Sequence, residues 1–191
     1  FRGKNLAEYL DMFLVVCPRC KSLCSLFSHG NTLSCTHCGY AVEYDEYGYF
    51  STDAEPFFLN PQTWSEWQTS WLYELFSNSE YTSGEKALFS DVKTKLFTGK
   101  RRGRLRQYNW LGKVELFFDR IVFTPEKGKD YVFPIDQITG VNVQNNNKFE
   151  FYYNSNLYRF KFTTQHKSIY KYELAFQLVE KIKNTPKSNP G

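Results

Sequence analysis

The chain has 191 residues, of which 41% are hydrophobic and 19% aromatic, and it carries a formal net charge of +4. This composition supplies apolar material for a folded core and excludes a wholly disordered chain. The longest apolar run, residues 12–16, is far shorter than the roughly 20 residues that a membrane-spanning helix needs, so no transmembrane helix is predicted.

The charge is distributed unevenly along the chain. Residues 43–91 contain ten acids and one base, a balance of −9, whereas residues 92–191 contain nineteen bases and eight acids, a balance of +11. Opposite charge in adjacent segments predicts separate structural units, or two faces that attract each other.

A cysteine-rich segment follows residues 4–16, which are predicted to form a short helix or strand. Four of the five cysteines form two C-x-x-C pairs separated by fourteen residues: Cys17, Cys20, Cys35 and Cys38. Two cysteines three residues apart on a tight turn can direct both sulfurs at one ion, and a second turn completes a tetrahedron. Gly39 suits a turn that needs positive φ. We therefore predict a zinc ribbon over residues 1–52, with a structural Zn²⁺.

Three alternatives compete with zinc at this motif. An odd cysteine and the lack of a recognisable export signal disfavour disulfides, and two paired motifs do not fit a thioredoxin-type redox site. An iron centre of rubredoxin type uses similar ligands and stays open. Four thiolates close the coordination sphere, which favours a structural role over a catalytic one. Three further residues are considered as substitute ligands and are expected to be bystanders: Cys24, His29 and His37.

Residues 53–90 are predicted to form an acidic helix and a polar linker. Pro61 in the first helical position, with a capping box made by Thr63 and Glu66, predicts the start of the helix. Three tryptophans recur at helical spacing and place an aromatic stripe on one face: Trp64, Trp67 and Trp71. We expect this stripe to be core or domain interface, and a docking face or membrane-interface anchor is its functional alternative.

From residue 91 the hydrophobic pattern changes to a period of two, which predicts antiparallel strands with one solvent-exposed face. Turn residues separate the predicted strands, which cover residues 91–98, 104–109, 112–118, 120–124, 130–133, 141–144, 148–153 and 157–163. An amphipathic helix over residues 168–183 completes a domain of residues 91–184. The tail, residues 185–191, is expected to be frayed.

This order of strands and one C-terminal helix resembles a pleckstrin-homology-like or GRAM-like barrel. The apolar spacing of three segments carries the likeness: residues 112–123, 132–138 and 157–162. The resemblance implies a barrel capped by one helix. With the predicted zinc ribbon and connecting helix, the expected fold is mostly β with some α-helix.

A second resemblance covers more of the chain. Five segments are similar to a C-terminal extension of some bacterial 1-acylglycerol-3-phosphate acyltransferases: residues 2–10, 16–20, 35–38, 47–50 and 64–68. This likeness implies a non-catalytic, accessory region of an enzyme of phospholipid biosynthesis, whose partner is an upstream catalytic domain of the same chain. The family's His-x4-Asp motif does not occur in residues 1–191, so no catalytic residue is assigned. A chain that begins at Phe1 is accordingly expected to be cut from a longer protein.

A block of basic residues is the candidate for contact with an anionic partner, because the arginine fork matches phosphate: Lys100, Arg101, Arg102, Arg104 and Arg106. Its alternatives are a solvated loop or a patch that pairs with the acidic residues 43–91. In a pleckstrin-homology-like barrel the block would lie in or beside the first hairpin. We expect a cytoplasmic region, peripheral at the inner face of the membrane, that contacts anionic phospholipid or docks on its enzyme.

Two other functions stay open at this point. One is a nucleic-acid-binding zinc-ribbon module, which the acidic segment disfavours because it would repel a phosphate backbone. The other is a purely structural docking or dimerisation unit.

Overall fold

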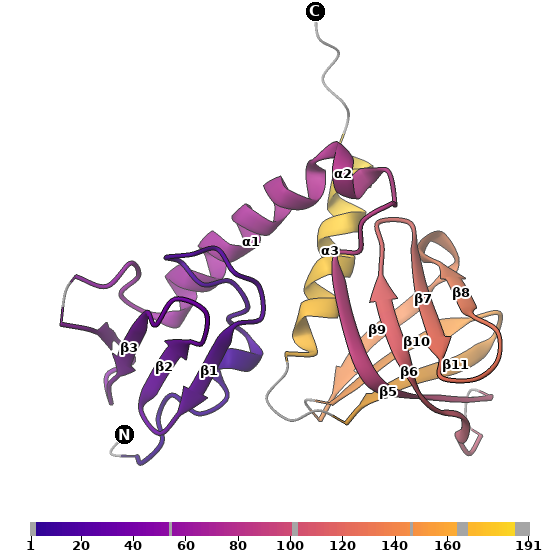
Figure 1. Cartoon of the computed structure of the whole chain (residues 1–191), viewed down its shortest axis with the longest axis horizontal. Coiled ribbons are helices and arrows are strands. Elements are labelled where there is room, and N and C mark those ends of the chain that lie inside the picture. The colour runs from indigo at the N-terminus through magenta and orange to yellow at the C-terminus, as the bar shows by residue number, and fades with distance from the viewer. Residues whose placement is uncertain (1–2, 54, 101–102, 146, 164–167, 186–191) are drawn as a thin grey trace, which may run out of the picture. The chain divides into compact units, whose positions relative to one another are not determined.

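The computed structural model describes residues 3–185, apart from residues 54, 101–102, 146 and 164–167 (Figure 1). Of the predicted frayed tail, residues 185–191, only Thr185 is therefore among the described residues. The chain divides into two compact units: the first comprises Phe1–Trp71 and Gln165–Ser168, and the second comprises Leu72–Thr164 and Ile169–Gly191. The division falls within one helix, α1 (Pro61–Ser77).

The first unit contains a small antiparallel sheet in the order β1-β2-β3-β4. Its elements are η1 (Leu10–Met12), β1 (Leu26–His29), β2 (Thr32–Cys35), β3 (Ala41–Tyr44) and β4 (Phe50–Ser51). The lead-in segment predicted over residues 4–16 thus forms only one 3₁₀ turn.

The core of this unit is small and includes two of the metal-site cysteines. Its buried members are Leu14, Cys17, Leu26, Leu33, Cys35, Tyr40, Val42, Phe50 and Trp64. Trp64 is 1% exposed, and its ring lies 5.5 Å from that of Phe50 and 6.2 Å from that of Tyr40. One large aromatic side chain therefore supplies much of the apolar packing in a unit whose strands are only two to four residues long.

Helix α1 begins where the sequence predicts, but with a different cap. The Oδ1 atom of Asn60 accepts a hydrogen bond from the backbone N–H of Thr63 at 2.9 Å, so Asn60 caps the helix from the residue before Pro61. The predicted capping box is wrong, because Glu66 accepts its hydrogen bond from the Gln62 side chain instead. Asn is a preferred N-cap residue, and its side-chain oxygen accepts a hydrogen bond from the N–H group three residues later.

The buried face of α1 also differs from the tryptophan stripe. Its buried positions recur every four residues: Trp64, Gln68, Leu72 and Phe76. Trp67 and Trp71 are half-buried, and their rings stack with centroids 6.3 Å apart. A glutamine therefore occupies the helix face where the periodicity predicted only aromatic residues.

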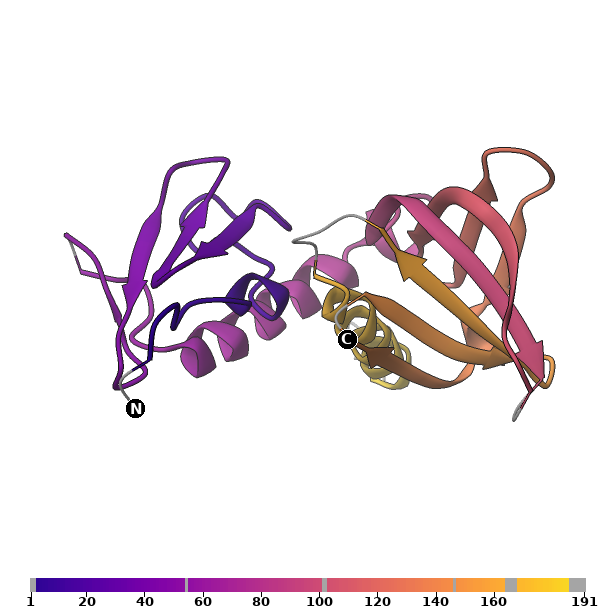
Figure 2. The same cartoon turned by 90° about the horizontal axis from the view of Figure 1, so that it is seen from below.

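The second unit is built on a seven-stranded antiparallel sheet in the order β8-β7-β6-β5-β11-β10-β9, with helix α3 packed near β9 (Figures 1 and 2). Its strands are β5 (Phe89–Lys100), β6 (Arg106–Leu116), β7 (Arg120–Pro125), β8 (Tyr131–Pro134), β9 (Thr139–Gln144), β10 (Lys148–Tyr153) and β11 (Asn156–Phe162). Its helices are α2 (Ser79–Thr82), η2 (Ile135–Gln137) and α3 (Tyr170–Asn184). The predicted fold class is confirmed: mostly β, with an N-terminal four-cysteine cluster, antiparallel sheets and a C-terminal helix.

One strand replaces two in the predicted series. Residues 104–109 and 112–118 were expected to be separate, yet β6 runs continuously from Arg106 to Leu116 with irregular pairing to β5. The reason is that Asn109, a turn residue in the predicted series, lies inside the strand and pairs with Leu96 of β5. Gly112 follows in the same strand, where a Cβ atom would lie 2.6 Å from a ring carbon of Phe123.

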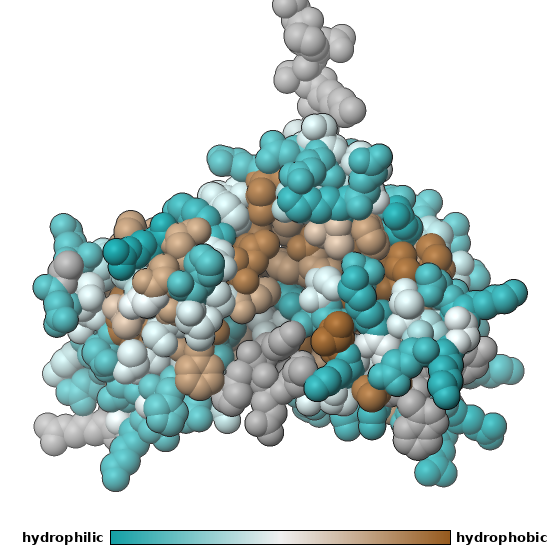
Figure 3. Space-filling view, viewed as in Figure 1, coloured by the Kyte–Doolittle hydropathy of each residue, from teal (hydrophilic) through white to brown (hydrophobic). Residues whose placement is uncertain are grey.

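Aromatic side chains fill the core of this sheet. Phe133 packs its ring 4.9 Å from that of Tyr158 and 5.2 Å from that of Phe151. Tyr172 on α3 is fully buried and lies 5.5 Å from Phe149. On the face drawn in Figure 3 the surface over the strands is mainly hydrophilic with separate brown residues.

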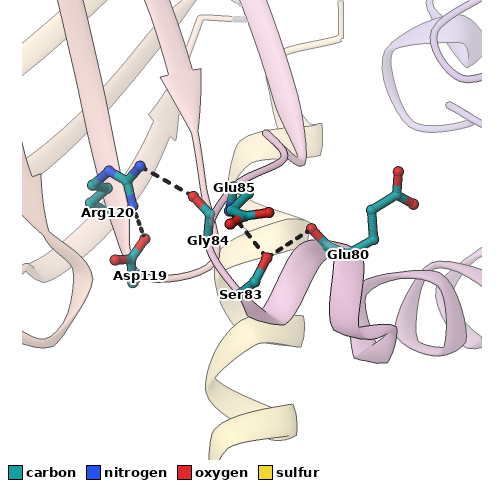
Figure 4. Close-up of polar contacts among 6 residues, drawn as sticks. All are labelled: Glu80, Ser83, Gly84, Glu85, Asp119 and Arg120. Atoms are coloured by element: carbon teal, nitrogen blue, oxygen red, sulfur yellow. Dashed lines mark hydrogen bonds and ion pairs between the residues drawn. The ribbon is translucent and has the colours of Figure 1, made fainter.

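The polar segment before β5 is attached to the sheet. After α2 the chain turns at Gly84, whose φ is +75°, and the Nη2 atom of Arg120 donates to the Gly84 carbonyl oxygen at 3.1 Å. Arg120 also pairs with Asp119 at 2.7 Å (Figure 4). A Cβ atom at Gly84 would lie 3.0 Å from the Asp119 carboxylate, so the turn packs tightly on the start of β7.

Candidate metal centre

The structure brings the four cysteines of the two C-x-x-C pairs together. Their Sγ atoms all lie within 4.8 Å of one another. The Sγ atoms of Cys17 and Cys38 are 3.7 Å apart, as are those of Cys20 and Cys35. Each close pair joins one cysteine of the first motif to one of the second, so the two motifs converge on one point.

Two similar backbone turns position these sulfurs. In the first, the N–H of Lys21 donates to the Cys17 carbonyl oxygen at 3.0 Å, and in the second, the N–H of Gly39 donates to that of Cys35 at 2.9 Å. Lys21 and Gly39 hold the same place in the two turns, and both have positive φ, +60° and +73°. The glycine predicted for such a turn is therefore present in only one of them.

The spacing of the sulfurs fits a tetrahedral metal ion. Four thiolates at a Zn–S distance of about 2.3 Å form a tetrahedron whose edges are about 3.8 Å. The two 3.7 Å pairs match that edge, and the largest separation exceeds it by about an ångström. Four sulfur ligands also leave no position for a reacting water, which is the arrangement of structural sites.

The thiols have divergent acidities. Burial raises the pKa of the Cys17 thiol to about 12, although the backbone N–H groups of Cys20 and Arg19 act in the opposite direction. Burial acts to raise the pKa of Cys35 as well, but hydrogen bonds from Ser25 and from the backbone outweigh it and lower the pKa to about 6. Four adjacent thiols cannot all ionise without a cation between them, because like charges repel. A divalent ion removes that barrier.

Helix α1 supports the segment that leads into the first cysteine. The indole Nε1 of Trp64 donates to the Val16 carbonyl oxygen at 2.9 Å, and Gln68 bonds to the backbone of Phe13 and Val15. Gln68 was not among the residues predicted from the sequence. It could have been recognised in the sequence as a single amide side chain, four residues after Trp64, on a helix face that otherwise carries apolar residues.

The substitute ligands considered from the sequence lie apart from this group. Within the described residues, the cluster comprises the four C-x-x-C cysteines alone. Cys24, His29 and His37 are all exposed. The N–H of Cys24 donates to the Val15 carbonyl oxygen at 2.7 Å, so this residue takes part in the adjacent backbone pairing.

The basic block lies at the connection of β5 and β6. Lys100 ends β5 and Arg106 begins β6, and both side chains are exposed, as is that of Arg104. Arg101 and Arg102 lie outside the described residues. Two of the three tryptophans of the predicted docking face are half-buried in α1, and Trp64 belongs to the core.

Comparisons with known proteins give a structural likeness and no sequence family. No protein-family model matches the chain, and no curated protein matches it. Among solved structures, the N-terminal PH domain of human ARAP2 is similar, at 16% identity over 52% of this chain and 91% of that chain, with a TM-score of 0.32. The pleckstrin-homology-like description of the second unit rests on its own order of elements, seven antiparallel strands and then a helix. No helix of the described residues is long and apolar enough to cross a membrane.

Proposed function

We propose that this chain is a non-catalytic accessory region whose first unit is held together by a structural Zn²⁺. The ligands would be Cys17, Cys20, Cys35 and Cys38. The observation that carries the proposal is the convergence of these four sulfurs within 4.8 Å. When bound, the ion supplies folding free energy to a unit with a small core.

Zinc is favoured over iron for a physical reason. Zn²⁺ has no redox chemistry and no preferred geometry of its own, so it suits a closed site that only has to hold a fold. A rubredoxin-type iron centre would use the same ligands and is therefore an outcome of the test.

Metal content tests this part of the proposal. We expect elemental analysis of the purified protein to find one zinc per chain, and Cys20→Ser to lower that ratio strongly. Cys24→Ser is the matched control, because it removes a nearby thiol outside the cluster and should retain zinc. Stoichiometric iron, or wild-type protein with neither metal, would contradict the proposal.

For the second unit we propose contact with an anionic phospholipid surface through the β5–β6 connection. The exposed Lys100, Arg104 and Arg106 support this, because cationic side chains near an anionic leaflet each contribute about 1 kcal/mol. Co-sedimentation with anionic and neutral vesicles tests it. We expect binding to anionic vesicles alone, and loss of that binding in Arg104→Gln/Arg106→Gln.

The same assay addresses the other two functions. Binding to DNA or RNA at matched salt, without binding to vesicles, would favour the nucleic-acid module. Binding to neither vesicles nor nucleic acid would favour a unit that docks on another protein. The half-buried Trp67 and Trp71 would be the candidate docking face.

The proposal extends to the parent protein, an acyltransferase of phospholipid synthesis at the inner face of the membrane. It rests on the resemblance of the first 68 residues alone. The natural sequence preceding Phe1 tests it: a His-x4-Asp motif supports the parentage, and an unrelated domain contradicts it.

A further inference from the structure

Three lysines lie side by side on adjacent central strands of the second unit. Lys161 on β11 is directly opposite Lys95 on β5, and it is also directly opposite Lys148 on β10. Residues directly opposite each other across a ladder point to the same face of the sheet. The three side chains therefore form one row on the outer face, which we call the lysine row.

The spacing of this row is unfavourable without a counter-charge. Neighbouring strands lie about 4.8 Å apart, so the row places three ammonium groups along about 10 Å. Directly opposed like charges destabilise a sheet. Lysines are common on edge strands, where they prevent association, but β5, β11 and β10 are interior strands of this sheet. Protection of an edge therefore does not explain them.

The protein itself does not neutralise the lysine row. The neighbouring cross-strand pair on this face is Glu150 opposite Arg159, and these two form their own ion pair. Throughout the described part of the chain, no carboxylate lies within 4.0 Å of the ammonium group of Lys95, Lys148 or Lys161. Lys161 is exposed and the other two are half-exposed, so a ligand can reach all three.

A polar side chain extends the row on the next strand. Gln144 on β9 is directly opposite Lys148, and its amide can donate a hydrogen bond to an anion. The face thus presents three cations and one neutral donor across four strands. We propose that the lysine row binds an anion that carries two or more phosphate groups. Lysine binds phosphate as a point charge, and several phosphates can neutralise several lysines of the row at once.

This site differs from the anion contact proposed above at the β5–β6 connection. Lys95 is five residues before Lys100 along β5, a separation of about 17 Å in an extended strand. Adjacent residues of a strand also point to opposite faces, so an odd spacing places these two side chains on different faces. Failure of one contact therefore leaves the other intact.

The probe for this proposal is inorganic tripolyphosphate, with inorganic phosphate as the comparison that carries a single phosphate group. Isothermal titration of the metal-loaded full chain at low ionic strength should show tighter binding of tripolyphosphate. Lys95→Gln/Lys161→Gln should weaken that binding at least tenfold. The matched control, Lys127→Gln/Lys129→Gln, removes the same charge from an exposed turn and should change binding less than twofold.

Three results would overturn the proposal: no binding of tripolyphosphate, unchanged binding in Lys95→Gln/Lys161→Gln, or an equal loss in the control. A separate double variant, Lys100→Gln/Arg104→Gln, distinguishes the two sites. We expect this variant to bind tripolyphosphate as tightly as the wild type. Loss of binding in this variant, but not in Lys95→Gln/Lys161→Gln, would place the anion at the β5–β6 connection instead. Vesicles with and without phosphatidylinositol bisphosphate, offered to the Lys100→Gln/Arg104→Gln variant, identify the source. Displacement of bound vesicles by tripolyphosphate would assign a lipid headgroup, and binding of tripolyphosphate alone would assign a soluble polyphosphate.

Discussion

The side chain of Gln68 binds the backbone of Val15: its Oε1 atom accepts a hydrogen bond from the Val15 N–H at 2.8 Å. Its Nε2 atom donates to the Phe13 carbonyl oxygen at 2.7 Å. Gln68 is fully buried, so both ends of one amide are used where water has no access. This links α1 to the segment that enters the first cysteine turn at Cys17.

Gln68→Ala should therefore destabilise the first unit. It leaves a backbone N–H and a backbone carbonyl without partners, and each buried unpaired group costs about 1–3 kcal/mol. Gln62→Ala is the control on the same helix, because Gln62 is exposed. Urea unfolding of the metal-loaded protein measures both. Equal midpoints for the two variants would show that the Gln68 contacts contribute nothing.

Gly112→Ala should destabilise the second unit through overpacking. The added Cβ would lie 2.5 Å from the Thr124 carbonyl oxygen and 2.6 Å from a ring carbon of Phe123. Overpacking of this kind costs about 1–3 kcal/mol. Ser90→Ala, at an exposed position of β5, should change stability by less than about 0.5 kcal/mol. A thermal midpoint of Gly112→Ala equal to that of Ser90→Ala would contradict the close packing of β6 on β7.

A buried ion pair fixes the start of α3. Lys171 Nζ lies 2.5 Å from Asp91 Oδ2, with side-chain exposures of 3% and 1%, and the Tyr172 hydroxyl donates to the same oxygen at 2.8 Å. Asp91→Asn should cost about 3–5 kcal/mol, because it removes the negative charge that Asp91 supplies to the buried Lys171 ammonium group. The exposed pair Lys86–Glu80 is the comparison, and Glu80→Gln should cost less than about 1 kcal/mol. If denaturant unfolding gives the same small decrease in the free energy of unfolding for both variants, this role of the buried ion pair is refuted.

Zinc affinity should fall as pH is lowered. The pKa of the Cys17 thiol is raised to about 12 in the metal-free protein, so metal binding at neutral pH must displace its proton. The pKa of Cys35 is lowered to about 6. Its thiolate is therefore already present at neutral pH, and it adds to the proton competition only below about pH 6. Competition with a chromophoric chelator at several pH values measures how the zinc affinity changes with pH. A zinc affinity that does not depend on pH would contradict the prediction.

The metal ligands and the β-rich second unit could be predicted because each has a local signature. The C-x-x-C spacing of Cys17 and Cys20 is a property of one turn, and alternation such as that of Phe149 and Phe151 is a property of one strand. The cap at Asn60 was missed because the Thr63–Glu66 pattern was followed, although Pro61 in the first helical position already places the N-cap one residue earlier.

The remaining features depend on contacts between distant segments. The role of Gln68 requires the partner backbone at Val15, which lies 53 residues earlier. The lysine row requires the register of β10, β11 and β5, since Lys95 and Lys161 are 66 positions apart in the sequence. Asn109 shows the reverse case, in which a residue predicted to form a turn lies inside β6 and pairs with Leu96.

The dependence of the first unit's fold on zinc is tested by a residue-resolved amide NMR spectrum recorded before and after addition of a strong chelator. We expect the signals of residues 3–71 to collapse to unfolded positions as zinc is removed, while those of β5–β11 stay dispersed. A spectrum of the first unit that is unchanged when the chelator has removed all metal would contradict it.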